Sequence, residues 1–163
     1  MKYIFLLILY TVAGHPSFSQ ADTSLLYLKF PNIPPFSITK IPDSSKFTKA
    51  DLKKRKPLMI MIFSPDCDHC QRETKDLIAN INLFKDEQIL MVSHLDYPMI
   101  KKFYEDYQVA DHPNITMGRD ASYFLGTFFN IHNLPVIFLY DKKGNFKKAF
   151  EGSVSMKKIA EDF

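Results

Sequence analysis

The chain of 163 residues lacks the features that mark several classes of protein. It has two cysteines, too few for a scaffold held together by several disulfides. Lys and Arg number 21 against 18 Asp and Glu, and the basic residues are scattered, which argues against a nucleic-acid-binding protein. We find no phosphate-binding loop, no pair of catalytic carboxylates, no internal repeat and no low-complexity tract. The length fits one domain with a substantial core.

The N-terminal segment looks like a targeting signal rather than part of the fold. Residues 3–13, YIFLLILYTVA, form an apolar run with the length of a signal-peptide core, too short to span a bilayer. The small residues Ser17 and Ser19 predict cleavage after Ser19, so we expect a signal peptide over 1–19 and a single domain over 20–163. An uncleaved anchor is the alternative. Export would place the chain in the periplasm, a redox-managed compartment.

Strand-like and helix-like patterns alternate along the rest of the chain. Continuous apolar runs, as in PLMIMIF and QILMVS, are typical of strands buried on both faces. We expect strands over 25–30, 36–41, 57–63, 88–93, 135–140 and 146–152, a short helix or turn over 47–56, and helices over 67–84, 96–109, 121–130 and 155–163. This order predicts an α/β fold, a three-layer α/β/α sandwich with a mixed central sheet and an N-terminal strand extension.

Both cysteines stand in the sequence CDHC, as Cys67 and Cys70, with Asp68 and His69 between them. The pattern puts Cys67 at the start of a helix that follows a buried strand, where the helix dipole and free N–H groups stabilise a thiolate. Cys70 lies one turn further on, within reach of the Cys67 sulfur. A C-x-x-C pair in this setting indicates redox chemistry, with one thiol attacking and the other resolving a mixed disulfide. Asp66 is the expected N-cap.

Four features together carry a resemblance that covers about residues 30–160. They are the lead-in PPFSI…FTKADLKKRKPLMIMIFSPDC, the CDHC motif, Glu73 three residues past Cys70, and NLPVIFLYDKKGN around Pro135. The chain resembles the exported thiol-disulfide oxidoreductases of the TlpA/ResA type, in the thioredoxin-like AhpC/TSA redoxin superfamily. The resemblance implies that Cys67 attacks, that Cys70 resolves, and that Glu73 tunes the thiol pKa values and passes a proton. It also implies that Pro135 is cis and that Leu134 presents its backbone to a bound polypeptide.

The motif departs from most relatives, which have Trp in place of Asp66 and a Pro-containing dipeptide in place of Asp68 and His69. The acids beside the sulfur oppose a thiolate, whereas His69 favours one only if it is protonated. We therefore expect a reducing couple near the thioredoxin value of about −270 mV. The expected activity is disulfide reduction in protein substrates, with a membrane-bound electron donor, no cofactor, no nucleic acid and a monomeric chain.

Other interpretations remain open at this stage. A zinc half-site would need two further ligands from His94, His112 and His132. A thiol peroxidase would use Ser64 and a partner such as Arg119, although Ile60 stands where that motif has proline. A copper carrier would use both cysteines and a histidine. Two single residues also have alternatives, since Glu73 could be a solvated carboxylate and Pro135 an ordinary proline at the start of a strand.

Overall fold

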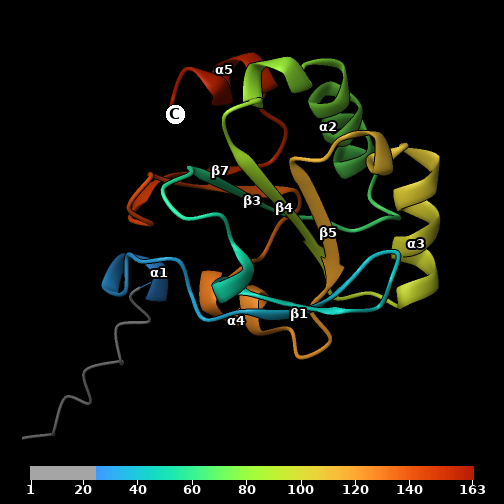
Figure 1. Ribbon diagram of the computed structural model, residues 1–163, viewed down its shortest axis with the longest axis horizontal. Coiled ribbons are helices and arrows are strands. Elements are labelled where there is room, and N and C mark those ends of the chain that lie inside the picture. The colour runs from blue at the N-terminus through green and yellow to red at the C-terminus, as the bar shows by residue number, and fades with distance from the viewer. Residues whose placement is uncertain (1–24) are drawn as a thin grey trace, which may run out of the picture.

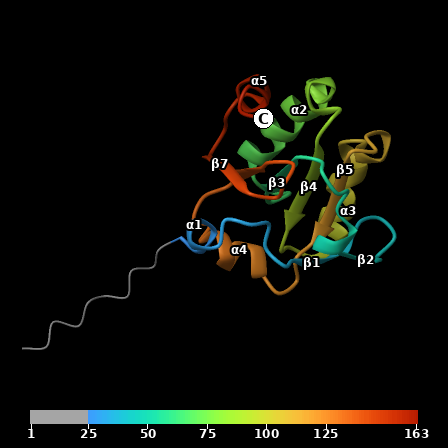
Figure 2. The same ribbon diagram turned by 60° about the vertical axis from the view of Figure 1, so that its left-hand side comes forward.

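A seven-stranded mixed sheet with helices on both faces forms the fold in the computed structural model, which describes residues 25–163 (Figures 1 and 2). The expected signal peptide lies outside these residues. The strands are β1 Ser37–Lys40, β2 Lys46–Thr48, β3 Leu58–Ile62, β4 Gln88–Ser93, β5 Ile115–Arg119, β6 Val136–Tyr140 and β7 Phe146–Glu151. The helices are α1 Leu26–Lys29, α2 Asp68–Ala79, α3 Tyr97–Asp106, α4 Phe124–Phe129 and α5 Met156–Ala160. Among the described residues, no helix has both the length and the apolar character needed to cross a membrane.

The sheet has the strand order β2-β1-β5-β4-β3-β6-β7. Strands β3, β4 and β5 are parallel, and every other neighbouring pair is antiparallel. Since the carboxyl ends of parallel strands meet at one edge, β3 delivers Cys67 and β4 delivers Ser93 and His94 to the same edge, as the sequence predicted. The expected sandwich with a mixed sheet is confirmed.

Two apolar clusters, one on each face of the sheet, hold the layers together. All five residues of β3 are buried, and their side chains alternate between the faces. Met59 and Met61 pack with residues of α2, α3 and α5, while Leu58 and Ile60 pack with residues of α4 and with the Tyr27 ring of α1. Burying each such side chain stabilises the fold by roughly 1.5–3 kcal/mol, so β3 is the central support of the site at its end.

The strand expected over 25–30 is wrong, because this segment contains the short helix α1. The segment 25–30 lies beside α4 on one face of the sheet (Figure 1). Tyr27 holds α1 in place by packing edge-on against Phe138 and Phe146, with ring centroids 5.2 and 5.0 Å away. Pro31 follows directly and prevents the helix from continuing.

Two expected elements have different bounds in the structure, and one strand was not expected. The segment 47–56 contributes β2 and a 3₁₀ helix at Lys49–Asp51. The helix expected over 67–84 ends at Ala79, where the Asn80 side chain donates to the Asp76 backbone carbonyl at 3.0 Å, and a 3₁₀ helix follows. Strand β5 was not predicted, since Gly118 and Arg119 interrupt its apolar pattern. Gly118 is required there because a Cβ would lie 2.9 Å from the Thr39 backbone oxygen of neighbouring β1.

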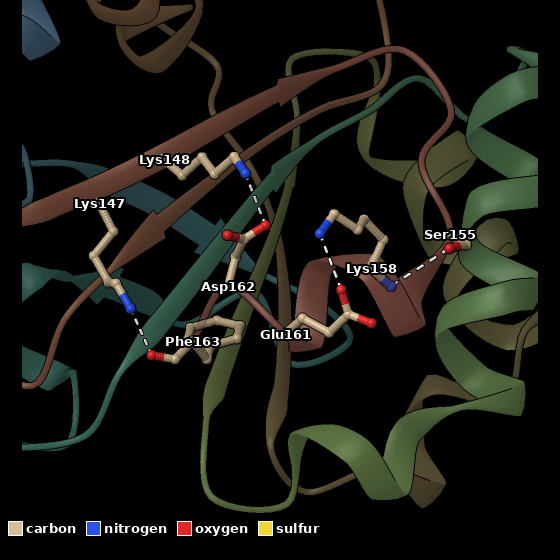
Figure 3. A network of polar contacts seen from close by, with 7 residues as sticks. All are labelled: Lys147, Lys148, Ser155, Lys158, Glu161, Asp162 and Phe163. Carbon is tan, nitrogen blue, oxygen red and sulfur yellow. Dashed lines mark hydrogen bonds and ion pairs between the residues drawn. The ribbon is translucent and has the colours of Figure 1, made fainter.

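The last helix is tied to the outer strand by a set of polar contacts (Figure 3). Lys148 on β7 forms an ion pair with Asp162 at 2.8 Å, and this contact lowers the pKa of the Asp162 carboxyl. Lys147 donates to the backbone carbonyl of Phe163. At the start of α5 the Ser155 hydroxyl accepts from the Lys158 N–H, as an N-cap does. These contacts hold the end of α5 against β7.

Candidate dithiol active site

Cys67 stands where β3 gives way to α2, and it is itself the N-cap of that helix. Its backbone is extended, and its Sγ accepts a hydrogen bond from the Cys70 N–H at 3.3 Å. The side chain is partly exposed. The N–H groups of the first helical turn thus point at an accessible sulfur, an arrangement that stabilises negative charge on it.

The expected N-cap at Asp66 is wrong. Asp66 lies one residue too early, and its exposed carboxylate accepts from the Ser64 hydroxyl instead of from the helix. The acceptor that satisfies the first turn is the sulfur of Cys67. The sulfur of Cys67 therefore caps the helix, a role that a side-chain oxygen usually has.

Cys70 is fully buried on the inner face of α2. Its Sγ accepts from the Ser64 N–H at 3.5 Å. Burial, and to a lesser extent the hydrogen bond with Cys67, raise the pKa of the Cys70 thiol to about 12. The two thiols are therefore unequal, with one partly exposed at the helix end and one buried and neutral.

Glu73 lies one turn beyond Cys70 and is only 4% exposed, so it is not a solvated carboxylate. Its Oε1 accepts from the Val154 N–H at 3.3 Å, and Asp76 likewise accepts from the Met156 N–H at 2.7 Å. Burial raises the pKa of Glu73 to about 7, with a smaller contribution from Asp76. The site thus contains a buried carboxyl whose pKa lies near neutral pH, one helical turn from the buried Cys70 thiol.

The segment before β6 approaches the cysteines from the other side. The peptide bond between Leu134 and Pro135 is cis, as expected, and Pro135 is buried. The Leu134 carbonyl oxygen lies 3.9 Å from the Cys67 sulfur, within the range of a weak thiol hydrogen bond. The Pro135 carbonyl accepts from the Gly152 N–H at 2.9 Å, which ties this segment to the loop before α5.

The residues between the cysteines face outward. Asp68 and His69 are both exposed. The Arg72 guanidinium lies 2.9 Å from His69 Nδ1, and the Ser153 hydroxyl lies 3.3 Å from the same nitrogen. A guanidinium can only donate, so Nδ1 is the acceptor in this contact.

The sequence around this site also matches a known protein family. A model described as a thioredoxin-like domain matches residues 45–161, which is most of the chain and includes Cys67, Cys70, Glu73 and Pro135. The chain belongs to this thioredoxin-like family. None of the curated protein sequences compared with the chain matches it.

Solved structures share the fold of this thioredoxin-like domain at low sequence identity. MTB DsbF is 22% identical with a TM-score of 0.67, over 78% of this chain and 92% of that one. A secreted Mycobacterium tuberculosis disulfide oxidoreductase, homologous to Escherichia coli DsbE, is 18% identical with a TM-score of 0.66, over 78% and 93%. StoA from Bacillus subtilis is 17% identical with a TM-score of 0.59, over 80% and 98%.

The alternative sites receive no support from the geometry. Within residues 25–163, no group of three or more His, Cys, Asp and Glu side chains gathers as a metal site. His94 packs edge-on against Tyr123 with ring centroids 4.8 Å apart, and His132 is exposed. Arg119, the candidate partner for a peroxidase, forms an ion pair with Asp96 at 2.8 Å.

Sequence reasoning missed the residues that reach the site from the last loop, Ser153 and Val154. They contact His69 and Glu73, which lie more than 80 positions earlier in the chain. Contacts between residues so far apart in the chain leave no signal in the local sequence pattern. Ser64 was singled out for a different chemistry, and here its backbone N–H contacts the buried Cys70 sulfur.

Proposed function

We propose that this thioredoxin-like domain is an exported thiol-disulfide oxidoreductase that reduces disulfides in protein substrates through the Cys67–Cys70 couple. The observation that carries the proposal is the inequality of the two thiols. One sulfur is partly exposed and receives a backbone N–H at a helix N-terminus, and the other is buried one turn inside. This is what attack followed by resolution requires.

In the proposed reaction the Cys67 thiolate attacks one sulfur of a substrate disulfide. A mixed disulfide forms, and one substrate thiolate leaves and takes a proton. Cys70 then loses its proton and attacks the Cys67 sulfur, which releases the second substrate thiolate and closes the Cys67–Cys70 disulfide. The substrate gains two electrons and two protons. A membrane-bound electron donor restores the dithiol.

The second step needs a proton acceptor, because burial keeps Cys70 in the neutral thiol form at pH 7. Glu73 is assigned this role, since its pKa of about 7 leaves a share of the carboxyl ionised at neutral pH. Substrate polypeptide is assigned to the Leu134–Pro135 segment, whose Leu134 carbonyl lies beside the Cys67 sulfur.

The redox poise follows from the charges around the sulfurs. Asp66 and Asp68 flank Cys67 and oppose its thiolate, while His69 accepts from Arg72 at Nδ1 and offers no cation through that atom. The high pKa of Cys70 also disfavours a second thiolate. These charges oppose the stabilisation that the N-terminus of α2 gives to a thiolate, and a less stabilised thiolate makes the couple more reducing, so we expect a midpoint of about −270 mV.

Equilibration with glutathione buffers, with the dithiol fraction measured by alkylation, tests this assignment. A midpoint close to the thioredoxin value supports a reductase. A midpoint more positive than about −180 mV, the value for protein disulfide isomerase, contradicts the reductase role and favours an oxidase or isomerase.

Export is proposed separately, on the apolar run 3–13 and the small residues before Gln20. It is in keeping with a secreted oxidoreductase among the proteins of similar fold. N-terminal sequencing of the protein recovered from a periplasmic extract is expected to begin at Gln20. A chain that stays in the cytoplasm with Met1 intact contradicts export but leaves the dithiol chemistry untouched.

A further inference from the structure

A basic hollow lies at the edge of the sheet opposite to the cysteines. Its volume is about 340 Å³, and it is formed by the loop before β3, the turn between β6 and β7, and the segment after α1. Seven cationic side chains and no acidic one line it: Lys49, Lys53, Lys54, Arg55, Lys56, Lys142 and Lys143. All except Lys56 are exposed.

These cations are not neutralised by neighbouring acids. None of the seven forms an ion pair with a carboxylate in the part of the chain that the structure describes. Three acids lie next to lining residues in the sequence. Glu87 interacts with the charge of Lys56, although burial raises the pKa of its carboxyl overall. The other two accept hydrogen bonds within their own turns. Asp51 accepts from the Thr48 N–H and hydroxyl, and Asp141 accepts from the backbone of its own turn. The hollow is therefore a concentrated positive field in which no cation is ion-paired to a carboxylate among the described residues.

Exposed apolar side chains adjoin this field. Leu26, Leu28 and Phe30 are 40%, 58% and 55% exposed, three of the six most exposed large apolar residues on the described surface. Tyr27 turns inward and fastens α1 to the sheet, so its neighbours are presented outward on a fixed support.

The apolar residues and the basic hollow are continuous. Asn32, two positions after Phe30, lines the hollow and forms a bridge with Asn145. The Ile33 N–H donates to the Gly144 carbonyl at 3.0 Å, which joins this segment to the β6–β7 turn. Figure 1 shows α1, the loop before β3 and the β6–β7 turn together on the left side of the molecule.

We propose that this surface docks the domain onto a bilayer that carries anionic phospholipid headgroups. Lysines bind the headgroup phosphates, while Leu26, Leu28 and Phe30 enter the boundary between headgroups and acyl chains. The apolar residues decide between a bilayer and a soluble polyanion, because a soluble polyanion offers nothing to bury them. The chain outside the described residues also joins here, directly before α1.

Docking in this way orients the active site. Strand β3 begins beside the hollow and ends toward Cys67, and its five residues alone span about 16 Å. The dithiol therefore points away from the bilayer and stays open to substrates in solution. This inference is independent of the redox assignment, since no residue of the surface belongs to the dithiol site.

Binding is measured with residues 20–163, which keep every described strand and helix and both apolar clusters. The chain contains no tryptophan, so Phe30→Trp introduces a single interfacial fluorophore. We expect a blue shift, and quenching by brominated acyl chains, with phosphatidylglycerol vesicles and not with phosphatidylcholine vesicles. Met99→Trp is the matched control, because Met99 is 42% exposed on α3 at the other side of the molecule. It should show neither effect.

The charge requirement is tested with two sets of variants of equal net charge. Neutralising the hollow by changing Lys53, Lys54, Lys142 and Lys143 to Gln should weaken binding to anionic vesicles at least about 100-fold, since each basic residue near the membrane contributes roughly fivefold. Neutralising Lys101, Lys102, Lys157 and Lys158, on α3 and α5, should change it less than about threefold. Equal losses in both sets overturn the proposal. So does binding to soluble polyphosphate without binding to vesicles, or an unshifted Phe30→Trp spectrum.

Discussion

Replacing Glu73 with Gln removes a buried acid that the fold accommodates at a measurable cost. The pKa of Glu73 rises from the ordinary 4.5 to about 7, chiefly because the carboxylate is buried. Between these pH values the folded protein keeps a proton that the unfolded chain has already released. The native state then binds more protons, so its free energy of unfolding falls as the pH rises from about 4.5 to 7.

The magnitude follows from the size of that rise. At 1.36 kcal/mol per pKa unit, ionising Glu73 lowers the free energy of unfolding by at most about 3 kcal/mol above pH 7. The Val154 N–H stabilises the carboxylate form, so we expect about 2 kcal/mol, below this upper limit. Glutamine is uncharged at every pH, and its side-chain oxygen can still accept from Val154.

Glu73→Gln is therefore expected to stabilise the reduced protein by about 2 kcal/mol at pH 8 and by little at pH 4.5. Urea unfolding across this pH range, with a reductant present, measures the difference. Glu151→Gln, which removes an exposed carboxylate on β7, is the control and should show no such step. The reasoning is refuted if Glu73→Gln destabilises at pH 8, or if its effect is the same at both pH values.

The same variant also tests the proposed proton transfer. Without an ionisable group at position 73, resolution of a mixed disulfide should slow at pH 7 and lose its dependence on a group titrating near pH 7. The rate of attack by Cys67 should change much less. Quenched-flow alkylation separates the two steps, and an unchanged rate of resolution would remove Glu73 from the reaction.

Three further predictions follow from particular contacts. Cys70→Ser should accumulate a mixed disulfide between Cys67 and substrate on non-reducing gels, whereas Cys67→Ser should accumulate none; labelling of Cys70 first at neutral pH would reverse the two roles. Tyr140→Phe should raise the free energy of unfolding by about 1 kcal/mol, since the Tyr140 hydroxyl is buried without a hydrogen-bond partner among the described residues, and a loss of stability in urea would contradict this. Asp120→Ala should lower the free energy of unfolding by about 2 kcal/mol, because the buried Asp120 carboxylate accepts from the Leu125 N–H at 2.7 Å at the start of α4. A thermal melt unchanged from the parent would show that water replaces the carboxylate as the acceptor.

The sequence predicted those parts of the fold that depend on local pattern. Strands β3, β4 and β6 are uninterrupted apolar runs buried on both faces, and each lies within the expected range. The position of the C-x-x-C pair at the start of α2 followed from the strand before it. The family resemblance predicted the cis peptide bond before Pro135, whereas the sequence pattern alone favoured an ordinary proline at the start of a strand.

The failures have physical causes that lie outside any local window. The 25–30 segment has the composition of a strand, but it packs through Tyr27 onto Phe138 and Phe146 on one face of the sheet and forms the short helix α1 there. Asp66 is a good N-cap by residue type, yet the chain enters α2 one residue later, and a sulfur takes the capping role. The environment of Glu73 depends on Val154, 81 positions away, so its burial became visible only in three dimensions.

The two outer strands of the sheet influence how the protein behaves at high concentration. Strand β2 is three residues long and begins with the exposed Lys46, and β7 carries the exposed Lys147 and Lys148. A copy of the same strand that added to either edge would bring its own lysines against these charges, and at β7 it would also compete with the contact of Lys147 with Phe163. Short or lysine-bearing edges oppose cross-β aggregation, so the domain can be concentrated and refolded without edge-to-edge pairing.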